Sequence, residues 1–101
     1  MGDKMINIAK DFSRAPAGRF VTDGPNSGTR FRDQFLLPAL KSGADTITVE
    51  LDGVRSYGSS FLDEAFGGLK RAGFRAADLL HRLVFRSSDP SLVVEIKSYL
   101  S

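Results

Sequence analysis

The sequence predicts a small α/β domain, with a mixed sheet of about four strands and helices mainly on one face. Short apolar runs typical of strands alternate along the chain with runs of helical periodicity, and this order is typical of α/β proteins. The 101 residues, 42% of them hydrophobic, fit a single domain over residues 1–101 with one modest core. Cysteine is absent and only one histidine is present, so we expect no disulfide and no metal site.

Two short strands are expected near the N-terminus. Residues 5–8 and 18–21 carry the aliphatic and aromatic side chains of strands, and residues 14–18 between them supply proline and glycine for a turn. This connection is too short for a crossover, so the two strands should be antiparallel.

A helix should follow over residues 29–41, because apolar side chains recur there at helical spacing. Pro38 cannot donate a hydrogen bond to the carbonyl of Gln34, so we expect a kink or a break at this position. The side chains on the apolar stripe of this helix are Phe31, Phe35 and Ala39.

The second half of the chain alternates strands and helices. Residues 46–51 alternate apolar and polar side chains, as a strand with one buried face does. A helix is expected from Phe61 to about Ala72, with Gly73 as its C-terminal stop. Because strands separated by helices become parallel neighbours, we expect the last three strands to be parallel. The remaining predicted elements are a short helix over residues 75–81, a strand over residues 83–85, and a helix that begins at Asp89-Pro90 and continues to the C-terminus.

Three polar loops should lie together at the carboxyl ends of these parallel strands, where ligands bind in open α/β sheets. They span residues 22–28, 56–60 and 86–89. The simplest interpretation is that their small polar side chains cap the helices that follow. The alternative is a site for a small ligand or a nucleotide. The residues of this ligand loop would be Asp23, Asn26, Ser27 and Thr29.

The stretch over residues 54–66 carries the most specific signal. Ser59 and Ser60 lie where a strand leads into a helix, and backbone N–H groups at such a point are unpaired and favour negative charge. These hydroxyls can serve as a helix cap, as part of an anion site or as acceptors of a phosphate. As a cap, Ser60 would accept a hydrogen bond from the N–H of Leu62 or Asp63, and Asp63 would reach back as in a capping box.

The same stretch resembles a bacterial family of STAS-like domains of unknown function, which is related to sulphate transporter and anti-sigma-factor antagonist (STAS) domains. The clearest likeness is in residues 59–69, with the sequence Ser-Ser-Phe-Leu-Asp-Glu-Ala-Phe-Gly-Gly-Leu, and a weaker likeness is in residues 10–13 and 28–33. The resemblance runs over most of the chain from about Ile6 and implies a STAS-like fold.

Anti-sigma-factor antagonists carry an Asp-Ser-Ser-Gly phrase at this loop. Its second serine is phosphorylated by a partner kinase of the GHKL ATPase type, and the phosphate blocks docking to that kinase. The resemblance therefore implies Ser60 as the candidate phosphoacceptor, with Ser59 as its neighbour, and a GHKL-type ATPase or kinase as the partner. Two positions depart from the phrase, because Gly58 stands in place of Asp and Phe61 in place of Gly. The two acidic residues one turn later should also repel an added phosphate.

A protein partner is expected to contact the start of this helix and the exposed face near Gly67 and Gly68. Glycines within a helix cost about 0.8–1 kcal/mol each relative to alanine, and they allow another backbone to approach closely. That backbone belongs either to a partner or a second copy of the chain, or to the helix at residues 75–81. The candidate partner-binding residues are Tyr57, Gly58, Phe61, Asp63, Glu64, Gly67 and Gly68.

The sequence thus predicts a non-enzymatic regulatory module that acts by protein–protein contact. No base is placed by its spacing near either serine, which argues against a nucleophilic enzyme, and we expect no cofactor. The net charge of +2 is spread along the chain, without the basic stripe of a nucleic-acid binder. No apolar run is long enough for a membrane span or a signal peptide, so the cytoplasm is the expected compartment. A homo-oligomer is compatible with the sequence.

Overall fold

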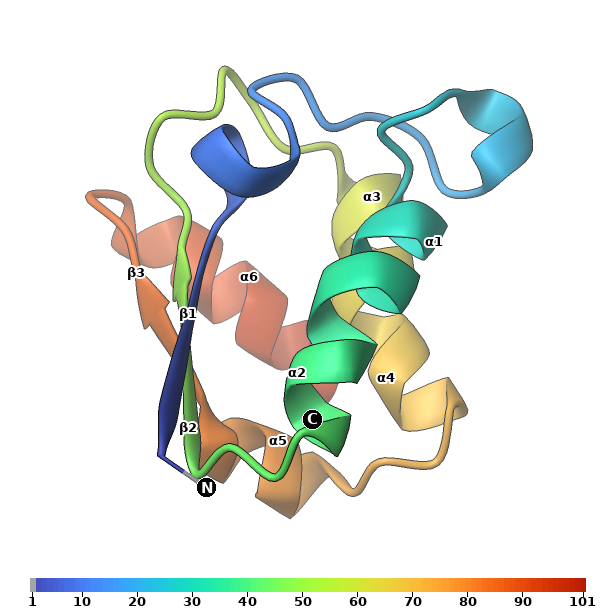
Figure 1. Cartoon of the computed structure of the whole chain (residues 1–101). Coiled ribbons are helices and arrows are strands. Elements are labelled where there is room, and N and C mark those ends of the chain that lie inside the picture. The colour runs from blue at the N-terminus through green and yellow to red at the C-terminus, as the bar shows by residue number, and fades with distance from the viewer. Residues whose placement is uncertain (1) are drawn as a thin grey trace.

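Three parallel strands and a layer of helices make up the fold (Figure 1). The computed structural model describes residues 2–101. The α/β class is confirmed, but within these residues the sheet has three strands rather than about four, and all are parallel. The strands are β1 (Asp3–Asn7), β2 (Thr46–Glu50) and β3 (Leu83–Arg86). The helices are α1 (Gly28–Phe31), α2 (Leu37–Lys41), α3 (Ser59–Leu62), α4 (Gly68–Arg71), α5 (Ala76–Arg82) and α6 (Pro90–Leu100).

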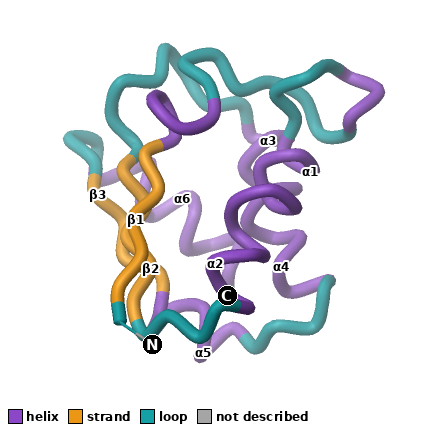
Figure 2. Tube along the Cα trace, viewed as in Figure 1, coloured by secondary structure: helices purple, strands orange, loops and turns teal. Residues whose placement is uncertain are grey.

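The strand order β1-β2-β3 explains why the helices lie on one face of the sheet. Each strand reaches its neighbour through a crossover, and two right-handed crossovers that advance in the same direction place their helices on the same side. Figure 2 shows the sheet as one layer with the helices beside it. The uncovered face carries Met5, Thr48 and Val84 in register across the three strands. Met5 and Val84 are 56% and 43% exposed, so this face is open to solvent.

The prediction of a strand over residues 18–21 is wrong, and the antiparallel pair expected from it does not form. This segment is a loop that leads into a single 3-10 turn, Val21–Asp23. The Asp23 carboxylate accepts hydrogen bonds from the backbone N–H groups of Arg19 (3.1 Å) and Phe20 (2.9 Å). A turn therefore satisfies the donors that a strand would have paired. The apolar side chains that suggested a strand, those of Phe20 and Val21, are exposed.

We call residues 17–28 the lobe. Its two ends are joined by backbone hydrogen bonds, from Ala17 to the carbonyl of Asn26 at 2.9 Å and from Gly28 to the carbonyl of Gly18 at 3.0 Å. Gly18 has a φ of +89°, a conformation that favours glycine. The lobe projects at the upper right of Figure 1, beyond α1 and on the side of the helices away from the sheet.

The predicted helix around Pro38 is continuous over residues 28–41, but its middle turn, Arg32–Leu36, is π-helical. The N–H of Leu37 donates to the carbonyl of Arg32, five residues back. A π turn widens the helix and changes the carbonyl that each N–H meets. This widened turn ends two residues before Pro38, and the helix continues past the proline. The expected kink or break is thus corrected to a π turn.

A second continuous helix covers residues 59–71 and consists of α3, a π-helical turn (Asp63–Gly67) and α4. It begins two residues earlier than the sequence predicts. The 28–41 helix crosses it closely at Gly28, where a Cβ would lie 2.6 Å from the carbonyl oxygen of Phe61. The largest side chains buried between these helices and the sheet are Phe31, Phe61 and Phe66.

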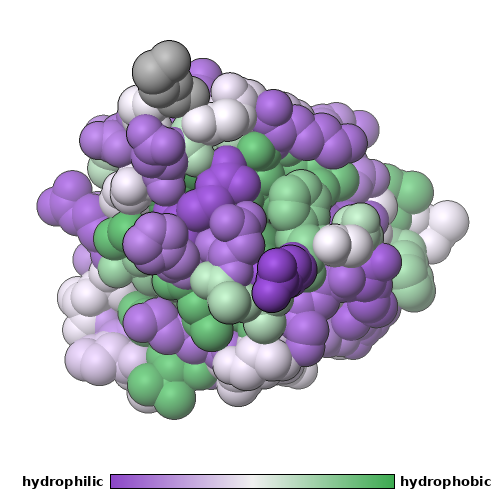
Figure 3. Space-filling view, turned by 90° about the horizontal axis from the view of Figure 1, so that it is seen from below, coloured by the Kyte–Doolittle hydropathy of each residue, from purple (hydrophilic) through white to green (hydrophobic). Residues whose placement is uncertain are grey.

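The C-terminal elements agree closely with the prediction. Asp89 is the N-cap of α6, where its carboxylate accepts a hydrogen bond from the N–H of Ser91 at 3.0 Å, and Pro90 is the first helical residue. Among the described residues, no helix is both long and apolar enough to cross a membrane. Figure 3 shows the end of the molecule at the amino ends of the strands, where hydrophilic side chains surround smaller hydrophobic areas.

Candidate functional site

Ser59 and Ser60 are the first two residues of the 59–71 helix, and both are exposed. The N-cap is Gly58 in an extended conformation (φ −78°, ψ 146°), and its carbonyl accepts a hydrogen bond from the N–H of Leu62 at 3.1 Å. The expected role of Ser60 as the cap is therefore wrong, because the helix begins before this residue. Within residues 2–101 neither serine hydroxyl has a hydrogen-bond partner, so both are free at the surface.

Ser60, Asp63 and Glu64 lie on one face of this helix, because residues three and four apart are neighbours. Asp63 lies on this face between Ser60 and Gly67, with its Oδ1 2.7 Å from the position that a Cβ on Gly67 would take. Arg19 reaches this face from the lobe, with its Nη1 2.7 Å from Asp63 Oδ2 and 3.5 Å from Glu64 Oε1. The capping-box contact expected of Asp63 is thus replaced by an ion pair with Arg19.

Two further arginines surround the same acidic pair. Arg32 Nη1 lies 2.6 Å from Glu64 Oε2, and only 15% and 12% of these two side chains are exposed. Arg71 Nη1 lies 3.6 Å from Asp63 Oδ1, and its Nη2 lies 3.5 Å from Glu64 Oε1. We call this set the charged cluster: Arg19, Arg32, Arg71, Asp63 and Glu64.

The charged cluster lowers the pKa of Asp63 below its usual range. The hydrogen bond from Arg19 is the largest cause, and the positive charge of Arg71 adds to it, while burial opposes the effect. Three arginines therefore surround the acidic pair beside Ser60, and one of them, Arg32, also pairs with Asp33 at 3.0 Å. The repulsion that the acidic pair was expected to exert on a phosphate is correspondingly reduced.

Gly67 and Gly68 make room for the charged cluster. A Cβ on Gly68 would overlap the guanidinium group of Arg32, and a Cβ on Gly67 would lie 2.7 Å from Asp63 Oδ1. Both glycines are buried. The groups that approach these glycines closely are the side chains of Arg32 and Asp63, from the same chain. The expectation that the helix at residues 75–81 makes this approach is corrected accordingly.

The remaining predicted partner-binding residues differ in exposure. Phe61 is fully buried against Phe31, so its side chain belongs to the core. Tyr57 is half-buried, and its hydroxyl donates to the carbonyl of Leu51 at 2.7 Å, which ties the loop after β2 to the end of that strand. Burial raises the pKa of Tyr57. The predicted residues that keep exposed surface are Tyr57, Gly58 and Asp63.

The residues of the predicted ligand loop lie in and beside the lobe, away from the carboxyl ends of the strands (Figure 1). Ser27 is buried and caps α1, and Thr29 Oγ1 donates to the carbonyl of Arg19 at 2.9 Å. Asp23 accepts hydrogen bonds from Arg19 and Phe20 within the lobe, and the Asn26 carbonyl accepts one of the bonds that close it. The expected meeting of three loops is therefore wrong for this loop, because the strand expected directly before it, over residues 18–21, does not form.

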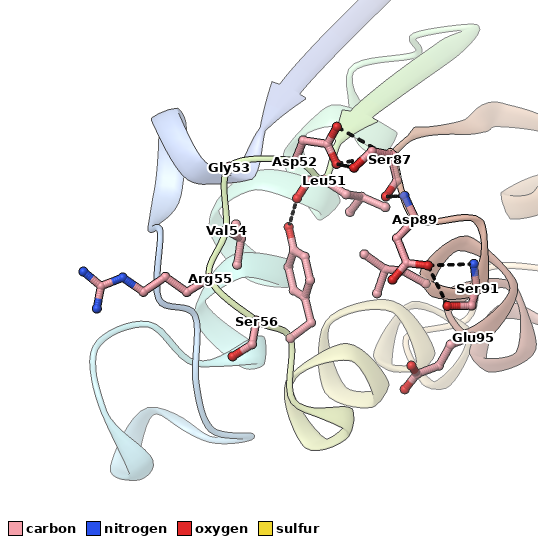
Figure 4. A pocket seen from close by; sticks show the side chains of 13 residues that line it. Leu51, Asp52, Gly53, Val54, Arg55, Ser56, Ser87, Asp89, Ser91 and Glu95 are labelled. Atoms are coloured by element: carbon pink, nitrogen blue, oxygen red, sulfur yellow. Dashed lines mark hydrogen bonds between the residues drawn. The ribbon is translucent and has the colours of Figure 1, made fainter.

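The other two loops do meet, and they form a groove at the carboxyl ends of β2 and β3 with a volume of about 610 Å³ (Figure 4). Asp52 Oδ1 accepts hydrogen bonds from the N–H and the hydroxyl of Ser88, at 2.9 Å and 3.1 Å. Arg55 points away from the α6 side of the groove in Figure 4. The acidic side chains that line the groove are Asp52, Asp89 and Glu95.

Sequence reasoning missed the arginines of the charged cluster and part of the groove. Arg19 is separated from Asp63 by 44 residues, and no spacing or periodicity links the two positions. Asp52 did carry a signal, because it follows β2 closely at the carboxyl end of the sheet, where sites of open α/β sheets lie.

A comparison with protein families matches residues 27–92 to a STAS-like domain of unknown function (DUF4325). No curated protein and no solved structure matched the chain. The matched segment begins at the N-cap of α1, ends in α6 and contains the whole 59–71 helix. The match confirms the resemblance inferred from residues 59–69 and covers more than half of the chain. The protein therefore belongs to this STAS-like family.

Proposed function

We propose that this STAS-like domain is a non-enzymatic regulatory module that is phosphorylated at Ser60 and acts by contact with another protein. The pair of free, exposed hydroxyls at the start of the 59–71 helix carries the proposal. A helix start favours a phosphate through its unpaired N–H groups and its dipole. Ser59 is the neighbouring acceptor, and both hydroxyls are reachable by a kinase.

The proposed partner is a GHKL-type ATPase or kinase, since the STAS-like family is related to anti-sigma-factor antagonists, which such kinases control. The phosphorylation step forms a bond between Ser60 Oγ and the γ-phosphorus of ATP. It breaks the bond from that phosphorus to ADP, and the hydroxyl proton passes to a base of the kinase. The proposed docking surface combines the loop from Tyr57 to Ser60 with the exposed edge of Asp63, and the proposed setting is the cytoplasm.

Mass spectrometry of the protein purified from its native host tests the phosphorylation. We expect phosphate on Ser60 under at least one growth condition, and its loss in a Ser60→Ala strain. Ser91→Ala is a matched control, because this serine is also exposed in the first turn of a helix. Absence of phosphate from Ser59 and Ser60 under every growth condition would contradict this part of the proposal.

A pulldown from the same host tests the partner. The unmodified domain should recover a GHKL-type ATPase, and Ser60→Glu should weaken the recovery because a negative charge then stands at the docking surface. Equal recovery by the wild type and Ser60→Glu would show that Ser60 does not control docking.

The groove supports a second candidate function, the sensing of a small ligand. Its place at the carboxyl ends of β2 and β3 is where open α/β sheets bind ligands. Three carboxylates line it, which favours a ligand with amino or hydroxyl groups over a free nucleotide phosphate. Calorimetry of the isolated domain with nucleosides, amino acids and polyamines tests this function. If none of these compounds binds, the groove has no role in sensing such ligands.

A further inference from the structure

We propose that Arg19 is the ligand of a phosphoryl group on Ser60, and that its transfer from Asp63 to this group moves the lobe. The inference rests on the proposed phosphorylation of Ser60 and adds how the modification is read. It makes Arg19 a sensor residue and the lobe a moving part of the docking surface.

Arg19 is placed beside the acceptor by the geometry of the 59–71 helix. Its Nη1 contacts both Asp63 and Glu64, at 2.7 Å and 3.5 Å, so the guanidinium group lies between the two carboxylates. Ser60 is three residues before one of them and four before the other. Side chains at these spacings are neighbours on a helix, so a phosphoryl group on Ser60 is added within one turn of the guanidinium.

Of the two arginines that reach the charged cluster from outside the 59–71 helix, Arg19 is the more readily transferred. Arg32 is 15% exposed and is fixed from several sides, by Asp33 Oδ1 at 3.0 Å and by the carboxylate and the backbone carbonyl of Glu64 at 2.6 Å and 3.1 Å. The Arg19 side chain is 32% exposed and has one short contact, to Asp63. A second arginine, Arg71, stays on Asp63 when Arg19 leaves, so the carboxylate is not left unpaired.

A phosphoryl group competes well for this arginine. It carries a charge of about −1.5 to −2 at pH 7 and three acceptor oxygens, whereas Asp63 carries a single negative charge. A guanidinium group binds such oxygens with two parallel hydrogen bonds. Arg19 and Arg71 both contact the two carboxylates beside Ser60, and their side chains are 32% and 55% exposed, so an added anion meets two accessible guanidinium groups there.

The backbone of Arg19 connects this exchange to the lobe. Its N–H donates to Asp23, and its carbonyl accepts hydrogen bonds from the N–H of Thr29 at 3.1 Å and from Thr29 Oγ1 at 2.9 Å. The next two residues, Phe20 and Val21, are the exposed apolar tip of the lobe, with 51% and 59% of their surfaces exposed. Because these bonds fix the Arg19 backbone within the lobe, a shift of Arg19 toward Ser60 would carry with it an aromatic and an aliphatic group of the kind that anchor protein interfaces.

The test uses the full chain phosphorylated at Ser60 by incorporation of phosphoserine during translation, so it does not depend on a kinase. The second pKa of the phosphoryl group, ordinarily about 6, is measured by ³¹P NMR. We expect Arg19 to lower this pKa by about 0.5 or more, and Arg19→Gln to return it toward 6. Arg19→Lys should restore part of the effect, because it keeps the charge but not the two parallel hydrogen bonds. Arg75→Gln is the matched control, because this exposed arginine lies beside α5 at the other end of the molecule.

The amide signals of Thr22 and Gly24 report on the lobe in the same samples. They should move on phosphorylation when Arg19 is present and stay unchanged in Arg19→Gln. A pKa that is equal in the wild type and in Arg19→Gln would overturn the proposal, and unchanged lobe signals alongside an Arg19-dependent pKa would overturn the movement of the lobe. Absence of phosphate on Ser60 in the native host would instead contradict the proposed function, and it would not affect the results of these measurements.

Discussion

The charged cluster and the groove both contain acidic side chains, but these are satisfied in opposite ways. In the groove, Asp89 accepts hydrogen bonds from the N–H and the hydroxyl of Ser91, and Asp52 accepts them from Ser88. In the charged cluster, the carboxylates are held by arginines from the lobe, the 28–41 helix and the end of the 59–71 helix. The groove keeps its negative charge, whereas the charged cluster neutralises its own. The first region therefore suits cationic groups and the second suits an added anion.

The comparison predicts that the charged cluster contributes more to stability than the groove does. Glu64→Ala should lower the free energy of unfolding by about 3 kcal/mol, because the largely buried Arg32 then keeps only the half-exposed carboxylate of Asp33 as a charged partner. Asp52→Ala should cost about 1 kcal/mol, because it removes exposed hydrogen bonds to Ser88. Urea unfolding followed by circular dichroism measures both values. Equal losses of unfolding free energy in the two variants would show that the charged cluster does not contribute more to stability than the groove.

A second prediction concerns the helix crossing beneath the charged cluster. Gly28→Ala should cost about 2 kcal/mol, because the added methyl group would lie 2.6 Å from the carbonyl oxygen of Phe61. The matched variant Gly58→Ala meets no atom within 4 Å and should cost less than about 1 kcal/mol, the range of an N-cap change. The same unfolding measurement applies. A neutral Gly28→Ala would mean that the two helices separate without loss, and would weaken the case for a rigid cluster.

The smallest expected effect is a dependence of stability on pH. The pKa of Asp63 is lowered in the folded state, so this residue contributes stability that is present above its ordinary pKa of about 3.9. The contribution is lost as the pH falls through the lowered value. Because a third of the side chain is exposed, it should be below about 1 kcal/mol.

Unfolding of the wild type and Asp63→Asn at a series of pH values from 7 to 3 measures this contribution. The difference between the two proteins should be constant at neutral pH and shrink in the acidic range, and added salt should reduce it. A difference that persists unchanged to the lowest pH would assign it to packing rather than to charge.

The predictable parts of the fold were those that depend on local patterns. The alternation at residues 46–51 predicted β2, and Asp89 with Pro90 predicted the start of α6, because each pattern lies within one element. The strand predicted over residues 18–21 was wrong, because the apolar side chains of Phe20 and Val21 are exposed at a turn. The turn depends on the Asp23 carboxylate, whose contacts to Arg19 and Phe20 have no counterpart in strand periodicity.

The candidate site was predictable only in its position along the chain. Ser59 and Ser60 could be placed at a strand-to-helix junction from the sequence. The arginines around Asp63 could not, since their positions depend on how the lobe and the two long helices come together. The glycines at 67 and 68 were a signal of close approach, and the approaching groups are guanidinium side chains rather than a backbone.

The order of the strands also determines how the chain must fold. β2 is the central strand and pairs with partners whose sequence positions lie on both sides of it, each across a long helical crossover. Neither pairing forms until its crossover has closed, and contacts between residues so distant in sequence make folding slow relative to a helical bundle of the same length. The amides in the middle of β2, at Thr48 and Val49, should therefore exchange with solvent only when the whole domain unfolds, which native-state hydrogen exchange would measure.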